Sequence, residues 1–179
     1  MRRVPRGAWI VGVLMVAFAL AGGSLAQEKG KAVQPVPTDK LGGFLKDLSN
    51  WKAEGPAEGQ TMNSPQGTYS IAFRSYTQGE KGLEITLIDG AGVPEAYEDY
   101  KDLKAEVGGK GPNSAKASTV AGHPALEIFD SDSETATLMV LVKERFLVIL
   151  DLDGATAKDD LKPLANQLDW KGLEGLLPK

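Results

Sequence analysis

The densest apolar pattern in the chain lies in residues 137–154, TLMVLVKERFLVILDLDG. Leu138–Val142 and Phe146–Leu150 are unbroken apolar runs, separated only by Lys143-Glu144-Arg145. Several of their residues are β-branched, which favours an extended backbone, and the lack of alternation is typical of strands covered on both faces. A buried helix can carry such a run too, but the central charges and the Asp-Leu-Asp-Gly that follows favour two antiparallel strands.

Alternation of apolar and polar residues predicts further strands. Tyr69, Ile71 and Phe73 fall on one side of the first alternating run, and Leu83, Ile85 and Leu87 share one face of the next. The turn residues between these runs make them a hairpin. The predicted strands are 68–77, 83–89, 116–120, 125–129, 138–142 and 146–150, with one short edge strand near Thr61-Met62 inside the loop 54–67.

Apolar residues at helical spacing predict a helix after Thr38 and another that starts at Pro94 and ends at Gly108-Gly109. In the first helix, Gly42-Gly43 cost about 1 kcal/mol each relative to Ala, so the helix depends on docking its apolar face. The residues at helical spacing are Leu41, Phe44, Leu45 and Leu48 in the first helix, and Tyr97, Tyr100, Leu103 (or Lys104) and Val107 in the second.

A last helix is predicted over about residues 159–168, and its start has two interpretations. A capping box of Thr156 and Asp159 would leave Pro163 inside the helix and kink it. If Asp159 is the cap, Pro163 lies near the first turn at small cost. Trp170, Leu173 and Leu176 then form a terminal turn against the core.

This order of elements predicts the α+β class, because helices lie between and after the strands rather than alternating with them. We expect one domain over residues 38–177, with a mostly antiparallel sheet of about six strands and helices packed on it. The doubly apolar central hairpin calls for some helix on each face.

The first 26 residues have a different composition from the rest. Arg2, Arg3 and Arg6 form a basic start, residues 8–21 are almost wholly apolar, and Ser24-Leu25-Ala26 places small residues where a signal peptidase cuts. We expect residues 1–26 to be a signal peptide cleaved before Gln27, residues 27–37 to be a flexible linker, and the protein to be periplasmic or extracellular. The alternative is an uncleaved membrane anchor, which would be the protein's one attachment to a membrane.

Removal of residues 1–26 takes away three Arg and no acid. It leaves 17 Lys plus Arg against 24 Asp plus Glu, a net charge of −7 with His neutral. An acidic domain without a basic cluster is a poor candidate for binding nucleic acid. The chain has no cysteine, so an exported form relies on its core rather than on disulfides.

The sequence offers no catalytic set. It lacks a G-x-S-x-G elbow, a P-loop and a dinucleotide fingerprint, and the absence of cysteine excludes a thiol nucleophile. His123, the one histidine, lies in Ala-Gly-His-Pro between two predicted strands, where we interpret it as a turn residue rather than a base or metal ligand. We therefore predict neither an enzyme nor a bound cofactor.

Asp151, Asp153 and Asp160 are weak candidates for a metal site. Set against a calcium-binding loop, Asp151 and Asp153 match the third and fifth positions, and Asp160 matches the twelfth. The first position is Ile149, which offers no carboxylate, and a strand rather than a helix precedes the loop. We predict no metal here and interpret the acids as solvated or as favourable charges at a helix start. A second acidic cluster, in residues 130–134, is weaker.

A resemblance to known proteins rests on several short segments spread over most of residues 38–177. The chain is similar to a group of uncharacterised exported bacterial proteins, and its element order resembles the Mog1/PsbP-like α+β sandwich. The resemblance implies a fold and an accessory or binding role, and it implies no chemistry. The segments are Gly67-Thr68-Tyr69-Ser70, Arg74-Ser75-Tyr76, Ile88-Asp89-Gly90, the run from Val120 to Glu127, and the run from Val142 to Val148.

Three functions stay open at this point. The first is an exported, non-enzymatic binding or accessory protein of the cell envelope, with an envelope protein or a small ligand as its partner. The second is a structural or assembly partner tethered at the membrane. The third is a hydrolase that uses carboxylates, which would need two buried acids facing each other in a cleft.

Overall fold

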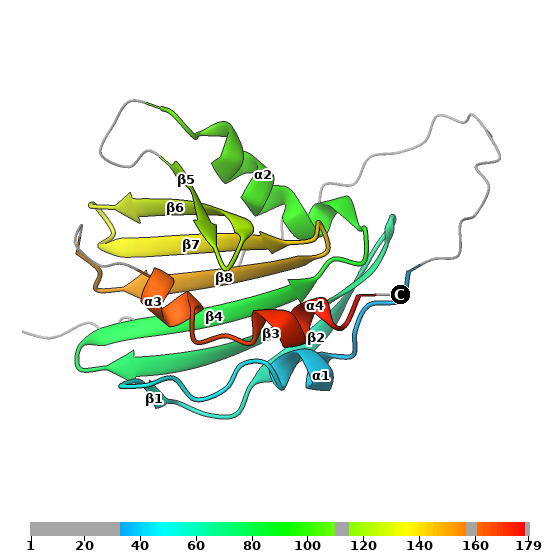
Figure 1. The fold of residues 1–179 in the computed structure, drawn as a ribbon, viewed down its shortest axis with the longest axis horizontal. Helices are drawn as coiled ribbons and strands as arrows, with labels where there is room; N and C mark the ends of the chain where they lie inside the picture. The colour runs from blue at the N-terminus through cyan, green and yellow to red at the C-terminus, as the bar shows by residue number, and fades with distance from the viewer. Residues whose placement is uncertain (1–32, 110–114, 157–160, 178–179) are drawn as a thin grey trace, which may run out of the picture. The chain divides into compact units, whose positions relative to one another are not determined.

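The computed structural model describes residues 33–109, 115–156 and 161–177. Its strands form one open antiparallel sheet in the order β1-β3-β4-β8-β7-β6-β5, with β2 also beside β3 (Figure 1). The coarse α+β prediction is therefore confirmed, but the sheet has eight strands rather than about six. The strands are β1 (Lys52–Ala53), β2 (Glu58–Ser64), β3 (Gly67–Gln78), β4 (Lys81–Asp89), β5 (Lys116–Val120), β6 (His123–Asp130), β7 (Thr135–Val142) and β8 (Phe146–Asp153).

The helices in the described residues are short. They are α1 (Thr38–Gly42), the 3-10 helix η1 (Pro94–Tyr97), α2 (Glu98–Ala105), α3 (Lys162–Ala165) and α4 (Trp170–Glu174). None of the helices in the described part of the chain is long and apolar enough to cross a membrane.

The sheet is built from two antiparallel parts that meet where β4 pairs with β8. Strands β2 to β4 form one part, and β5 to β8 form the other as consecutive hairpins. The predicted hairpin of residues 138–150 is confirmed as β7 and β8. Its turn places Lys143 and Glu144 at φ 51° and 55°, a reversal whose twist matches that of the flanking strands.

One face of the sheet, the core face, carries the fully buried side chains of Ile85, Leu138 and Leu150. The N-terminal segment with α1 and the C-terminal segment with α3 and α4 cover this face. The predicted inward alternation of Leu83, Ile85 and Leu87 is confirmed, since all three belong to this core.

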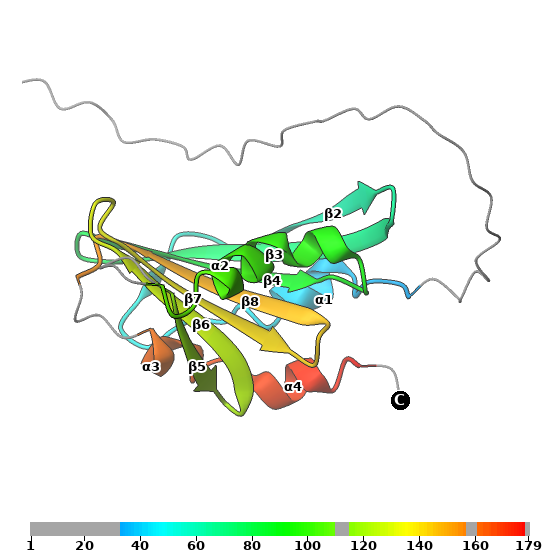
Figure 2. The same cartoon turned by 90° about the horizontal axis from the view of Figure 1, so that it is seen from above.

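The opposite face, the α2 face, carries Ile88, Leu147 and Ile149 and is covered by η1 and α2 through Tyr97 and Tyr100. Figure 2 shows α2 on one side of the sheet and α3 and α4 on the other. Helices thus lie on both faces, as the apolar hairpin predicted. The cover is unequal, however. Half-buried side chains on the α2 face include Tyr69, Ile71 and Phe73 of β3 and Met139 and Leu141 of β7.

Two N-terminal predictions need correction. The first helix ends at Gly42 rather than continuing to Leu48, because two successive glycines favour leaving the helix. Leu45 and Leu48 are nevertheless buried, so the apolar positions were identified correctly although their backbone was not. The edge strand predicted near Thr61-Met62 is the seven-residue β2.

At the C-terminal end, the predicted helix 159–168 is reduced to α3 in the described residues. Pro163 lies in its first turn, where the missing N–H breaks no helical hydrogen bond. Asp159 and Asp160 lie outside the described residues, so the cap proposed for Asp159 does too. The predicted terminal turn is the short helix α4, which Asp169 caps by accepting a 2.9 Å hydrogen bond from the Gly172 N–H.

Candidate functional site

His123 is not a turn residue as predicted. The turn is made by Ala121 and Gly122, both with positive φ, and His123 is the first residue of β6. It is 6% exposed and packs on Trp170, with ring centroids 5.8 Å apart. Its Nε2 lies 3.6 Å from Glu174 Oε1, longer than a hydrogen bond. The ring therefore fills space between β6 and α4.

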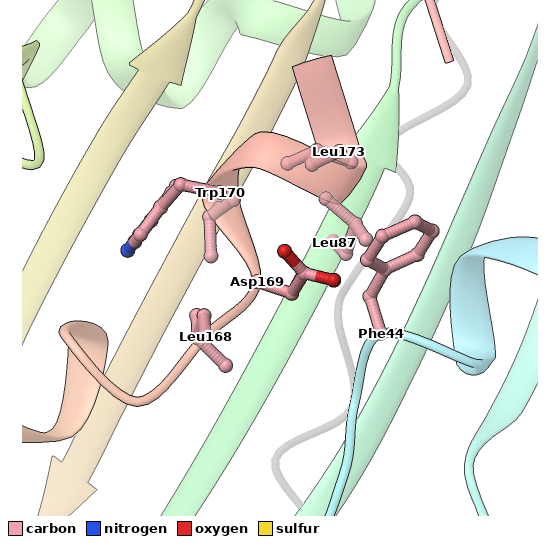
Figure 3. Close-up of a pocket in the computed structure, with 7 residues that line it drawn as sticks. Phe44, Leu87, Leu168, Asp169, Trp170 and Leu173 are labelled. Carbon is pink, nitrogen blue, oxygen red and sulfur yellow. The ribbon is translucent and has the colours of Figure 1, made fainter. Parts of the chain in front are cut away.

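A small apolar cavity lies beneath α4 (Figure 3). Its walls come from Phe44, the β4–β8 pair Leu87 and Val148, and the segment 168–173 around Trp170. The cavity volume is about 10 Å³, the lower limit for a single water molecule. This cavity does not provide the deep apolar pocket that a small-ligand site needs.

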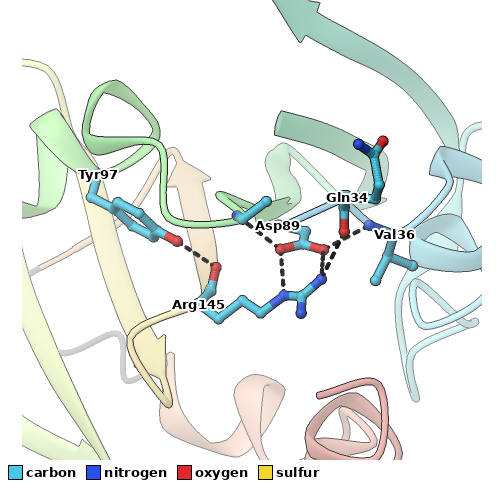
Figure 4. Close-up of polar contacts among 6 residues, drawn as sticks. Gln34, Val36, Asp89, Tyr97 and Arg145 are labelled. Carbon is cyan, nitrogen blue, oxygen red and sulfur yellow. Dashed lines mark hydrogen bonds and ion pairs between the residues drawn. The ribbon is translucent and has the colours of Figure 1, made fainter. Parts of the chain in front are cut away.

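The strongest polar contact in the described residues is a buried ion pair, which we call the clasp, between Asp89 and Arg145 (Figure 4). Arg145 donates from Nε to Asp89 Oδ1 and from Nη2 to Asp89 Oδ2, both at 2.8 Å. Asp89 also accepts from the Ala91 N–H at 3.0 Å. The carboxylate is fully hydrogen-bonded, and its pair with Arg145 raises the pKa of that guanidinium further.

The clasp also holds the N-terminal segment against the sheet. The Val36 N–H donates to Asp89 Oδ2 at 2.7 Å, and Arg145 Nη2 donates to the Gln34 carbonyl at 3.3 Å. Val36 itself is 8% exposed. The last part of the segment predicted as linker 27–37 is thus docked by specific hydrogen bonds. Since both oxygens of the Asp89 carboxylate are occupied by donors of the protein itself, we assign the clasp a structural role.

Three carboxylates gather on the α2 face and form what we call the acidic strip: Glu84, Asp151 and Asp153. The β4–β8 register places Glu84 directly opposite Asp151. Asp153 follows two residues later on the same face. In the described residues, the side chains of the acidic strip accept two hydrogen bonds. Thr137 Oγ1 donates to Asp151 at 2.6 Å, and Thr86 Oγ1 donates to Glu84 at 3.4 Å.

The surroundings of Glu84 and Asp151 disfavour the ionised form of both carboxyls. The Glu84 side chain is exposed, but neighbouring groups remove part of its solvent, and this partial desolvation, followed by the charge of Asp151, raises the pKa of Glu84. Burial likewise raises the pKa of Asp151, with smaller contributions from Asp153 and from Asp99 of α2, while the Thr137 hydroxyl lowers it. Like charges on facing strands destabilise a sheet. Ionised Glu84 and Asp151 therefore lower the stability of the folded protein.

The sequence candidates for a metal site are only partly brought together. Asp151 and Asp153 share the α2 face, Ile149 lies on the same face with its side chain packed under α2, and Asp160 lies outside the described residues. Within the described ranges, no group of three His, Asp or Glu side chains is close enough to hold a metal ion. Sequence reasoning missed Glu84, because only the pairing of β4 with β8 brings it to Asp151.

Together, the fold and the acidic strip define an α+β protein with an open antiparallel sheet, one well-covered face and one half-covered, acidic face. Comparison with protein-family models, curated proteins and solved structures found no match.

Proposed function

We propose that the protein is an exported, non-enzymatic binding or accessory protein of the bacterial cell envelope, which binds its partner on the α2 face. The observation that carries this proposal is the unequal cover of the sheet. Among the described residues, three helical segments and their loops bury the core face, whereas only η1 and α2 cover the other. Half-buried Ile71 and Phe73 on that face offer apolar surface of the kind that protein interfaces bury.

The chemistry of the described residues supports binding rather than catalysis. The histidine is buried against Trp170, and the Asp89 carboxylate of the clasp is fully hydrogen-bonded. The cavity beneath α4 is too small for a substrate. The signal-like segment 1–26 and the resemblance to exported bacterial proteins support export and an accessory role, and both remain predictions.

Site-specific photo-crosslinking tests where the partner binds. The full chain is expressed in bacteria with p-benzoylphenylalanine in place of Phe73, on the α2 face, or in place of Lys40, an exposed residue of α1 on the opposite side. We expect irradiated cells to yield a discrete crosslinked species from position 73 and none from position 40. Crosslinks of equal yield at both positions, or at neither, would contradict binding on the α2 face.

A tethered structural or assembly partner is the second candidate. The hydrogen bonds from the clasp to Gln34 and Val36 favour this candidate. They fix the start of the domain on the sheet, as a tethered domain would require. If the tethered candidate is correct, Arg145→Met, which removes the hydrogen bond to the Gln34 carbonyl, should reduce crosslinking at position 73 without unfolding the sheet.

A carboxylate-dependent hydrolase is the third candidate, and one observation favours it. Glu84 and Asp151 face each other across β4 and β8, and both have raised pKa values, as general acids do. Glu84 is exposed on an open sheet face, however, rather than enclosed in a cleft. Turnover of a panel of glycoside and ester substrates that Glu84→Gln abolishes would support the hydrolase.

A further inference from the structure

The charged side chains that the strands place on the α2 face are acids, except for Lys52 of β1, and α2 itself adds the exposed Lys101 and Lys104. In strands β2 to β4 and β6 to β8, all of which the structure describes, the side chains on this face include no Lys or Arg. The two-residue strand β1, at the margin of the sheet, adds Lys52, which lies opposite Thr77. The acids on this face are Glu58, Glu84, Asp130, Asp151 and Asp153.

No cation within the described ranges forms an ion pair with the acidic strip. Other Lys and Arg residues form ion pairs on the core face or at the sheet margins. These pairs are Arg74 with Asp47, Lys143 with Glu174, and Lys162 with Glu127, and Arg145 pairs with Asp89 in the clasp. Glu84 and Asp151 therefore face each other without a cationic side chain from these ranges. Their mutual repulsion is unfavourable, and a bound cation would reduce it.

The surface beside the acidic strip is apolar. Ser75 of β3 lies directly opposite Glu84, Phe73 pairs with Thr86 in the next row of the same face, and Ile71 pairs with Ile88 one row further, so the apolar side chains of β3 begin one row from the strip. Phe73 and Ile71 are half-buried. Burial raises the pKa of Tyr69, and the carboxylates of Glu95 in η1 and of Glu98 and Asp99 at the start of α2 raise it further, which places these acids near β3. The apolar side chains of this surface thus come from β3, and its acids come from β4, β8, η1 and α2.

Building on the proposed function, we infer that the α2 face binds a basic, partly apolar segment of another polypeptide. Lys or Arg side chains of the segment pair with Glu84, Asp151 and Asp153, and its apolar side chains cover Ile71 and Phe73. Charge complementarity is the argument for this occupant, since strands β4 and β8 place acids and no cation on the face, whereas the lysines of α2 are exposed and none forms an ion pair with the strip in the described residues. The apolar neighbours favour a partner that has apolar side chains as well as positive charge.

Two synthetic peptides test the charge of the partner. Each has about twelve residues, fluorescently labelled, with Leu alternating with Lys in one and with Glu in the other. Their binding to the protein purified from the exporting cell is followed by fluorescence anisotropy. We expect the Lys peptide to bind and the Glu peptide not to bind. The affinity should fall as ionic strength rises from about 50 mM to about 300 mM. Equal binding of both peptides would overturn the inference.

Matched variants locate the binding surface. Glu84→Gln/Asp151→Asn should weaken binding of the Lys peptide about tenfold or more. The control Asp39→Asn/Asp47→Asn changes the net charge equally, on exposed acids of the N-terminal segment over the core face, and should leave the affinity unchanged. Equal weakening by both double variants would show a general charge effect and overturn the site. Thermal unfolding confirms that both variants fold.

Two further readouts separate this inference from the proposed function. Spermine, which has charge but no apolar side chains, should compete poorly; competition as strong as that of the Lys peptide would overturn the apolar half of the inference. If position 73 crosslinks in cells and Glu84→Gln/Asp151→Asn leaves that crosslink unchanged, binding on the α2 face stands and the basic partner is wrong. If position 73 gives no crosslink, the proposed binding on the α2 face is contradicted, and the inference about a basic partner is contradicted with it.

Discussion

Asp89 and Arg145 meet in a two-pronged ion pair that joins the end of β4 to the turn between β7 and β8. Asp89 has no exposed surface, and the Arg145 side chain is 12% exposed. Both hydrogen bonds are 2.8 Å long. The Arg145 carbonyl accepts from the Gly90 N–H and the Tyr97 hydroxyl, so its backbone is fixed as well as its side chain. This one contact connects the two parts of the sheet, η1 and the N-terminal segment.

The clasp predicts a large loss for the removal of one partner. Arg145→Met leaves the Asp89 carboxylate buried with only N–H donors, and we expect the free energy of unfolding to fall by about 3 kcal/mol or more. Urea unfolding measures this loss. Lys143→Met, which removes a more exposed cation from the same turn, should cost under about 1 kcal/mol. A loss for Arg145→Met no larger than that of the control would show that the clasp contributes little.

The acidic strip predicts a variant that is more stable than the natural protein. Because burial raises the pKa of Asp151, the folded state disfavours its charge at neutral pH. Asp151→Asn keeps the acceptor for Thr137 and removes that charge, so it should raise the free energy of unfolding by about 0.5–1 kcal/mol. Thermal unfolding should show a rise in Tm of about 1–3 °C. A lower Tm would mean that the charge is favourable.

The same carboxyl sets the pH dependence of this gain. A raised pKa in the folded state means that the native protein binds the proton more tightly than the unfolded chain. The unfavourable contribution is complete above the folded pKa and disappears as pH falls below the unfolded value of about 3.9. The stability difference between Asp151→Asn and the natural protein should therefore shrink as pH is lowered. A difference that is constant with pH would contradict the assignment.

The position of β8 predicts the cost of a charge in the core. Val148 is 2% exposed and pairs with Leu87 and Val140. Val148→Asp buries an unpaired carboxylate, and we expect a loss of several kcal/mol, enough to unfold the domain. Lys143→Ala, at the exposed turn, should change stability little. Circular dichroism and urea unfolding compare the two variants, and equal small losses would contradict the burial of β8.

Asp151 and Asp153 should not make a calcium site. Asp151 already accepts from Thr137, and Ile149 offers no carboxylate at the position where a calcium loop begins. A metal that bound only the folded state would raise Tm by mass action. We expect no rise in Tm with millimolar calcium, measured by differential scanning calorimetry. A calcium-dependent rise that Asp153→Asn abolishes would establish the site.

The segment 1–26 predicts a processed exported protein. Cleavage before Gln27 removes Arg2, Arg3 and Arg6 together with the apolar run. We expect the intact mass of exported material to correspond to a chain that begins at Gln27. A membrane fraction that holds the full-length mass would identify the segment as an anchor instead.

The local pattern was enough to find the strands whose residues are apolar on at least one side. The β7–β8 hairpin and the alternation of Leu83, Ile85 and Leu87 were predicted correctly because each residue's neighbours in sequence already carry the signal. β2 was underestimated because Glu58–Ser64 is polar and contains glycine. It becomes a strand through its hydrogen bonds to β3, which no local pattern encodes.

The sequence by itself determined an acidic, cysteine-free chain with an organising hairpin and the α+β class. Only the tertiary structure decided which acids and cations meet. Glu84 with Asp151, and Asp89 with Arg145, depend on the pairing of β4 with β8, strands separated by α2 and three other strands. One pair holds like charges and the other opposite charges, although all four residues lie in or beside apolar strands. Their electrostatics follow from spatial separation and burial, which sequence neighbours do not set.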